Sequence, residues 1–173
     1  IAKACYVHGA DVTLLQDGPD VPYASVEPVE SATEMVAAAE AVAPEADALV
    51  SAAAIGDYTV EKRDSKIRSG QDTLTLELEP TPKLLDSVRE RAPDLPMIGF
   101  KLETDADDEG LIDVARDLLA RVDLSLVVAN DAGVAGATQT RALLVGPETT
   151  AEFTGSKAAL GTRIAGELAA RLQ

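Results

Sequence analysis

The sequence predicts an α/β fold with a doubly wound, mostly parallel sheet and a small antiparallel extension. Apolar strand-like runs alternate with amphipathic helical segments along most of the 173 residues. Residues 47–54 are almost entirely apolar or small, which is typical of a central parallel strand that is buried on both faces. Residues 141–146 and 150–155 indicate a short antiparallel pair near the end of the chain. Together these patterns favour a Rossmann-like architecture.

The first elements are a helix and a strand. Residues 1–8 have helix-like apolar spacing, and Gly9 permits a left-handed exit before the β-rich residues 10–15. A helix followed by a strand is the second half of a β-α-β unit. We therefore expect a first strand and a loop to precede residue 1. The next helix is expected over residues 31–46, where Ser31 and Glu34 have the spacing of a capping box.

The same alternation continues to the end of the chain. Proline in a first helical turn and serine at an N-cap mark two of the later helices. The sequence shows no repeat or linker, so we expect a single domain over residues 1–173. The expected strands cover 72–80, 95–101 and 124–130, and the expected helices cover 81–92, 108–122 and 157–173.

Composition restricts the classes of partner. Lys and Arg number 15 and Asp and Glu 30, so the net charge of −15 would repel nucleic acid. No apolar run approaches the ~20 residues of a membrane span and no export signal is visible, so we expect a cytoplasmic protein that acts without nucleic acid or membrane. Cys5 is the single cysteine, which excludes an internal disulfide. Such acid-rich composition is typical of proteins from a halophilic cytoplasm.

Ligands of doubly wound folds bind beyond the carboxyl ends of the strands. One pair there, Tyr58 and Lys62, has the spacing of the catalytic pair in short-chain NAD(P)-dependent dehydrogenases, and residues 127–133 resemble a turn of that family. In those enzymes the pair follows the turn and lies on a helix, whereas here it precedes the turn. Hydride transfer is therefore the weakest alternative. The polar or glycine positions after the apolar runs are Gly56, Asp57, Tyr58, Gly99, Phe100, Lys101, Asn130 and Asp131.

Six short motifs point to another family by their order. They are AAAIGDY at 52–58, SKIRSG at 65–70, LTLELEPTPKLL at 74–85, MIGFKLET at 97–104, LVVAND at 126–131 and GSK at 155–157. In this order and spacing the chain resembles the phosphopantothenate cysteine ligases, in particular their archaeal branch. The resemblance implies that CTP activates 4′-phosphopantothenate as an acyl cytidylate, which cysteine then attacks, in coenzyme A biosynthesis. A nucleotide-binding module without catalysis is the second alternative.

The resemblance also assigns roles to residues. Lys66 would be the catalytic lysine of a basic lid that includes Lys62, Arg63 and Arg68, and this lid would neutralise two polyanionic substrates. Asp57 would bind the nucleotide through its hydroxyls or through Mg²⁺. Ser51, Ala52 and Ala53 would line the nucleotide and acyl site; Thr81, Pro82, Lys83 and Leu84 would recognise the base through main-chain groups; Phe100 would lie against the nucleoside.

The sequence departs from the family pattern at one place. Bacterial members carry two lysines that meet the triphosphate, and here Leu118 and Val122 occupy those positions, with Arg121 nearby as a substitute phosphate donor. The choice between CTP and ATP therefore stays open. The family also implies that the loop before residue 1 is glycine-rich. It further implies a homodimer, for which residues 141–146 and 150–155 are the expected pairing elements. Its members are often fused to an N-terminal flavin-dependent decarboxylase, so FMN is expected only if such a domain precedes this chain.

The acidic composition leads to a first testable prediction. Carboxylates at this density repel one another over a Debye length of ~10 Å in ~0.1 M salt, but over only ~3 Å in ~1 M salt. We expect the melting midpoint to rise steadily as KCl is raised across this range, followed by circular dichroism. A near-neutral α/β protein melted in parallel is the control. A midpoint that stays constant or falls would contradict the interpretation of the charge as an adaptation to salt.

Overall fold

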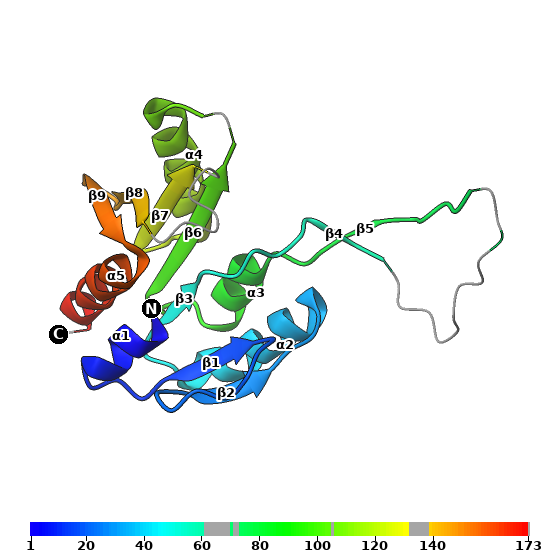
Figure 1. Cartoon of the computed structure of the whole chain (residues 1–173), viewed down its shortest axis with the longest axis horizontal. Helices are drawn as coiled ribbons and strands as arrows, with labels where there is room; N and C mark the ends of the chain where they lie inside the picture. Colours follow the sequence, from blue (N-terminus) through cyan, green and yellow to red (C-terminus); the bar gives the residue numbers. More distant parts are fainter. Residues whose placement is uncertain (61–69, 71–72, 105, 132–138, 173) are drawn as a thin grey trace.

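The computed structural model describes residues 1–60, 70, 73–104, 106–131 and 139–172 (Figure 1). Its centre is a five-stranded sheet in the order β3-β6-β7-β8-β9. Strands β3, β6 and β7 are parallel, while β8 and β9 run antiparallel to their neighbours. The predicted mostly parallel sheet with an antiparallel extension is confirmed. The strands are β3 (Leu49–Ser51), β6 (Met97–Glu103), β7 (Leu126–Asp131), β8 (Gln139–Val145) and β9 (Thr150–Ser156).

Helices cover both faces of this sheet. On one face Met97 and Val127 pack with apolar residues of α2, α3 and α4. On the other face Ile98 and Val128 pack with Ile164 of α5. Adjacent residues of one strand thus belong to two different cores, which is the defining feature of a doubly wound sheet. The helices are α1 (Ala2–Val7), α2 (Ala32–Val42), α3 (Leu84–Arg91), α4 (Asp108–Val122) and α5 (Lys157–Arg171), and a 3₁₀ turn, η1, covers Ala43–Glu45. None of the described helices has both the length and the apolar composition to cross a membrane.

Two short sheets lie outside the central one. β1 (Thr13–Gln16) and β2 (Ser25–Pro28) pair in parallel with each other and are not part of the five-stranded sheet. β4 (Tyr58–Thr59) and β5 (Glu79–Pro80) pair antiparallel at the base of an arm, formed by residues 58–60 and 73–80, that extends away from the body (Figure 1).

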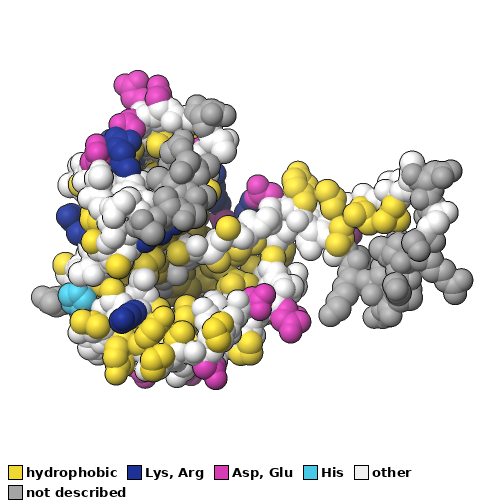
Figure 2. All heavy atoms as spheres, viewed as in Figure 1, with side chains coloured by type: hydrophobic (Ala, Val, Ile, Leu, Met, Phe, Trp, Pro, Cys, Tyr) yellow, Lys and Arg dark blue, Asp and Glu magenta, His cyan; other side chains and the backbone are white. Residues whose placement is uncertain are grey.

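The predicted strand over residues 72–80 is wrong for most of its described length, because only Glu79 and Pro80 pair with another strand. The alternation of Leu74, Leu76 and Leu78 is typical of a strand with one buried face, but all three side chains are half exposed on the arm. Figure 2 shows hydrophobic side chains along this arm. Periodicity alone indicated a strand here, although no described element of the chain covers the apolar face.

Polar side chains begin the helices at the expected places. Ser31 Oγ accepts a hydrogen bond from the Glu34 amide at 3.2 Å at the start of α2. Ser156 Oγ accepts one from the Ala159 amide at 3.1 Å at the start of α5. These caps satisfy amide groups that have no partner within the helix, so the predicted starts of both helices are confirmed.

Arg141 of β8 ties the start of α4 to the antiparallel extension. Its guanidinium donates to both carboxylate oxygens of Asp108, each at 2.7 Å, and to Glu152 of β9 at 2.9 and 3.0 Å. Hydrogen bonds from Arg141 lower the pKa of both carboxyl groups. The network joins three elements around one planar cation, which suits the fixed donor geometry of arginine.

Arg89 joins the ends of α3 and α4. Its guanidinium donates to the carbonyls of Val122 and Asp123 at 2.9 and 2.8 Å, and to those of Ala92 and Pro93 at 3.4 and 2.5 Å. Helix ends leave carbonyl groups without internal partners. One half-buried side chain therefore satisfies carbonyl groups at the ends of two helices.

We expect Arg89→Met to lower the free energy of unfolding by about 2–3 kcal/mol, because the hydrogen bonds to these carbonyls are lost while the packing of the aliphatic stem is kept. Urea unfolding in high salt measures the change. Arg91→Met is the matched control, since Arg91 is exposed in the last turn of the same helix. Equal losses in the two variants would show that capping by Arg89 contributes nothing specific.

Candidate functional site

The residues that follow β3 meet the turn before α3. The Thr81 amide donates to the Asp57 carbonyl at 2.9 Å, and Tyr58 pairs with Pro80 in the β4-β5 ladder. Lys83, the N-cap residue of α3, donates from Nζ to Asp57 Oδ1. Two segments that are far apart in sequence are thereby joined at the carboxyl end of a parallel strand. This is the edge at which doubly wound folds bind their ligands.

The Asp57 carboxylate is exposed and ionised. Its side chain is 72% exposed and that of Lys83 is 60% exposed. The hydrogen bond and the charge of Lys83 hold the pKa of Asp57 below its usual value, and the charge of Lys101 contributes in the same direction. Lys101 itself pairs with Glu103 at 2.8 Å on β6. The site therefore presents a carboxylate acceptor among cations, in contact with solvent.

The start of α3 adds unused donors to the same place. The first amide groups of a helix have no partner within it, and in α3 no side chain caps them either. Thr81 is only 5% exposed, and its Oγ1 has no hydrogen-bond partner in the described part of the chain. Amides at a helix start bind oxygen atoms of ligands readily. In this turn Lys83 and Leu84 can therefore offer main-chain donors, whereas the Thr81 amide is bonded to Asp57 and Pro82 has no N–H.

Ser51 is the last residue of β3 and lies beside Gly99 of β6 in the parallel ladder. Ala52 and Ala53 follow in an exposed loop on the way to Asp57. A Cβ atom on Gly99 would lie 2.8 Å from Leu124 Cδ1, so any other residue here would force that buried leucine side chain to shift. The residues at the carboxyl end of β3, and the residue beside it on β6, are thus all small.

Phe100 and Arg121 lie in other surroundings. Phe100 is half-buried and packs with the core that includes Ile98 and α5, so it is on the other face of β6 from its neighbour Lys101. Arg121 forms an ion pair with Asp86 of α3. The structure does not bring these two side chains to Asp57, and their contact with a nucleotide stays a prediction.

The two positions at which the resemblance implies lysines in bacterial members face the core in this chain. Leu118 packs against the core of α2, α3 and α4, and Val122 is 2% exposed within it. Lys66 and the other basic residues of the expected lid lie outside the described residues. Tyr58 belongs to strand β4, and not to a helix as the dehydrogenase alternative requires.

Asn130 follows an apolar run, and the sequence pattern assigns it no role. It is 8% exposed, and its Nδ2 donates to Thr140 Oγ1 at 3.3 Å and to the Arg141 carbonyl at 3.2 Å. The amide therefore holds the end of β7 against β8. No sequence pattern predicts the Asp57–Lys83 pair either, because no spacing rule joins residues that are 26 positions apart.

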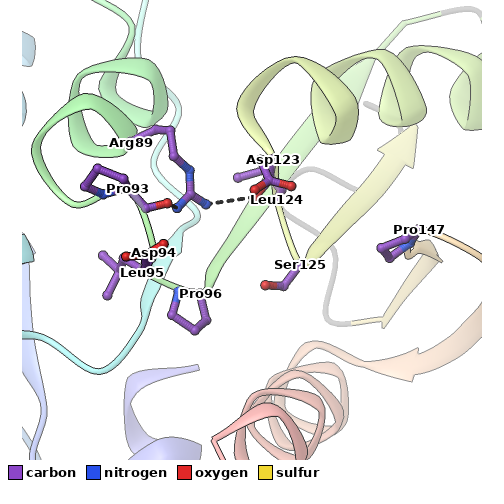
Figure 3. A pocket seen from close by; sticks show the side chains of 9 residues that line it. All are labelled: Arg89, Pro93, Asp94, Leu95, Pro96, Asp123, Leu124, Ser125 and Pro147. Carbon is purple, nitrogen blue, oxygen red and sulfur yellow. Dashed lines mark hydrogen bonds between the residues drawn. The ribbon is translucent and has the colours of Figure 1, made fainter.

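A cleft of about 350 Å³ lies at the opposite edge of the sheet (Figure 3). Pro96 and Ser125, which precede β6 and β7, line it together with Arg89 and Pro147. Since β6 and β7 begin at this edge, the cleft is on the side where doubly wound folds do not bind ligands. We therefore place the candidate site at Asp57.

The described residues gather no group of three or more metal-ligating side chains. Asp57 would supply one carboxylate oxygen to a metal, which is compatible with Mg²⁺ carried by nucleotide phosphates. The half-buried Cys5 lies in α1, and burial raises the pKa of its thiol.

Several known proteins are similar to this chain in sequence. The coenzyme A biosynthesis bifunctional protein CoaBC of Thermococcus kodakarensis is 41% identical over 152 residues, which are 84% of this chain and 37% of that protein. CoaBC of Bacillus subtilis is 34% identical over 143 residues, which are 79% of this chain and 34% of that protein. The chain thus spans little more than a third of these curated relatives.

Solved structures share the fold. The DNA/pantothenate metabolism flavoprotein from Streptococcus pneumoniae superposes with a TM-score of 0.80 at 23% identity, over 98% of this chain and 83% of that one. A Cab2 variant in complex with phosphopantothenate-cysteine superposes with a TM-score of 0.68 at 23% identity, over 87% of this chain and 53% of that one. A family model described as the DNA/pantothenate metabolism flavoprotein C-terminal domain matches residues 1–172. The chain therefore belongs to this family.

Proposed function

We propose that this chain is a phosphopantothenate cysteine ligase domain of coenzyme A biosynthesis that uses CTP. The observation that carries the proposal is the ionised Asp57 at the carboxyl edge of β3, beside the uncapped start of α3. Its support is the family match and the names of the CoaBC relatives. A neighbour in fold is a Cab2 variant solved with phosphopantothenate-cysteine, the product that such a ligase forms.

The reaction has two steps. The carboxylate of 4′-phosphopantothenate attacks the α-phosphorus of CTP, which gives an acyl cytidylate and releases pyrophosphate. The amine of cysteine then attacks the acyl carbon, loses a proton, and displaces CMP. Mg²⁺, when bound with the nucleotide, neutralises phosphate charge.

The chain's own residues orient the reactants. Asp57 accepts from the nucleotide hydroxyls or ligates its metal, and the turn at Thr81–Leu84 presents main-chain donors to the base. Ser51, Ala52 and Ala53 line the nucleotide and acyl site through their backbone atoms. Lys66 stabilises the negative charge that develops on departing pyrophosphate.

A nucleotide-binding module without catalysis is the second candidate. Leu118 and Val122 favour it, since both pack in the core where bacterial relatives are expected to have phosphate-binding lysines. The chain would then bind CTP or ATP without turnover. Mass spectrometry of mixtures with 4′-phosphopantothenate, cysteine and either nucleotide separates the two candidates. A new amide product supports the ligase, and nucleotide binding without product supports the module.

Two assemblies follow from the same proposal. The chain would form a homodimer through β8 and β9, because β9 is an edge strand of the central sheet. The relatives are named bifunctional, and the chain covers little more than a third of their length. A flavin-dependent decarboxylase that binds FMN is accordingly proposed for the rest of the protein.

Asp57→Asn should weaken CTP binding by roughly tenfold to a hundredfold, because a hydrogen bond to a charged acceptor contributes about 1.5–3 kcal/mol. The fold should persist, since Asp57 is exposed. Titration calorimetry in high salt measures the dissociation constant. The control is Asp47→Asn, which changes an exposed carboxylate before the other end of β3. Undiminished affinity in the Asp57 variant would mean that this residue only ends a strand.

Lys66→Gln, made in the full-length protein, should slow formation of the acyl cytidylate by roughly 10²–10³-fold. One well-placed donor to developing charge contributes about 3–4 kcal/mol to the transition state. A pyrophosphate-release assay without cysteine isolates this step, and melting curves check the fold. Lys62→Gln, in the same basic segment, is the control and should have a smaller effect. A normal rate with Lys66→Gln would leave the segment with no catalytic role.

A further inference from the structure

The Lys83 side chain makes a contact with Asp57 that the proposed function does not explain. The resemblance gives Lys83 only a main-chain role in recognising the base. In the structure its ammonium group instead reaches across 26 positions to Asp57 Oδ1. Lys83 is the N-cap residue of α3, so its backbone is fixed by the start of the helix while its side chain is free to extend.

The pair is not needed to hold the two segments together. The Thr81 amide already donates to the Asp57 carbonyl at 2.9 Å, and the β4-β5 ladder pairs Tyr58 with Pro80 next to it. Both charged side chains are mostly exposed, at 60% for Lys83 and 72% for Asp57. Exposed ion pairs add little to stability. The contact therefore has its main effect on the carboxylate itself.

We infer that Lys83 is a positioning residue, which orients the Asp57 carboxylate so that Oδ1 is held and Oδ2 faces a ligand donor. The inference rests on the proposed function of this site. A carboxylate on a short exposed side chain rotates freely, and holding one of its oxygens lowers the entropy that is lost when a ligand binds the other. The lysine charge also offsets the repulsion between Asp57 and an anionic nucleotide.

This role makes a specific demand on the ligand. If Lys83 acts through an Asp57 that accepts hydrogen bonds from the nucleotide hydroxyls, it affects a part of the nucleotide that CMP and CTP have in common. If Lys83 instead contacted the β- or γ-phosphate, its removal would weaken CTP far more than CMP. The two nucleotides therefore distinguish a positioning residue from a direct phosphate ligand.

The test is a double-mutant cycle with Lys83→Met, Asp57→Asn and the double variant, in which calorimetry measures CMP and CTP binding in high salt. We expect Lys83→Met to weaken the binding of both nucleotides by a similar factor of about two to five. In the Asp57→Asn background the same substitution should have no further effect. Lys83→Arg should restore most of the affinity, and the melting midpoints of all variants should stay close to the parent's.

Three results would overturn the inference while leaving the proposed function intact. They are unchanged affinity in Lys83→Met, a loss confined to CTP, and a loss that persists in the Asp57→Asn background. A parent chain that binds neither nucleotide would contradict the proposed function and this inference together. Should Lys83→Met melt early, Lys83→Gln, which keeps a polar side chain, repeats the cycle.

Discussion

The structure depends on one constraint, which is that parallel strands must be covered on both faces. β6 illustrates it most directly, because Met97 and Ile98 are adjacent, completely buried, and part of two different cores. Their burial requires α2, α3 and α4 on one side and α5 on the other. The chain that connects two parallel strands must run from the carboxyl end of the first strand back to the amino end of the second. The helices that supply these crossings also supply the cover.

The same constraint places the chemistry. Every crossing starts at the carboxyl end of a strand, so the chain leaves β3 and β6 for its loops at one edge. Asp57 follows β3, and α3 begins close by, with Lys83 between them. At the opposite end of the strands, Arg89 and its carbonyl acceptors join the ends of α3 and α4 beside the cleft. The carboxyl end is thus where Asp57 and Lys83 are kept in contact with solvent.

Sequence patterns predicted the central sheet, its helices and the helix caps well, because these features depend on local periodicity and on residues three or four apart. Ser31 with Glu34 and Ser156 with Ala159 are examples. The arm was mispredicted, since alternation at Leu74, Leu76 and Leu78 does not reveal whether anything covers the apolar face. Asp57 could be placed at a strand end, but its partner Lys83 could not be identified. Contacts across 26 positions depend on the path of the whole chain.

The arm is directly connected to the site, because β4 and β5 at its base follow and precede residues of the site. Tyr58 and Pro80, which pair at its base, are the immediate neighbours of Asp57 and Thr81. The described part of the arm is therefore continuous with the backbone of the site. A ligand that fixed this backbone would also restrict the direction of residues 58–60 and 73–80, and a partner that held those residues would in turn change the affinity for the ligand, since coupling between two binding events is reciprocal.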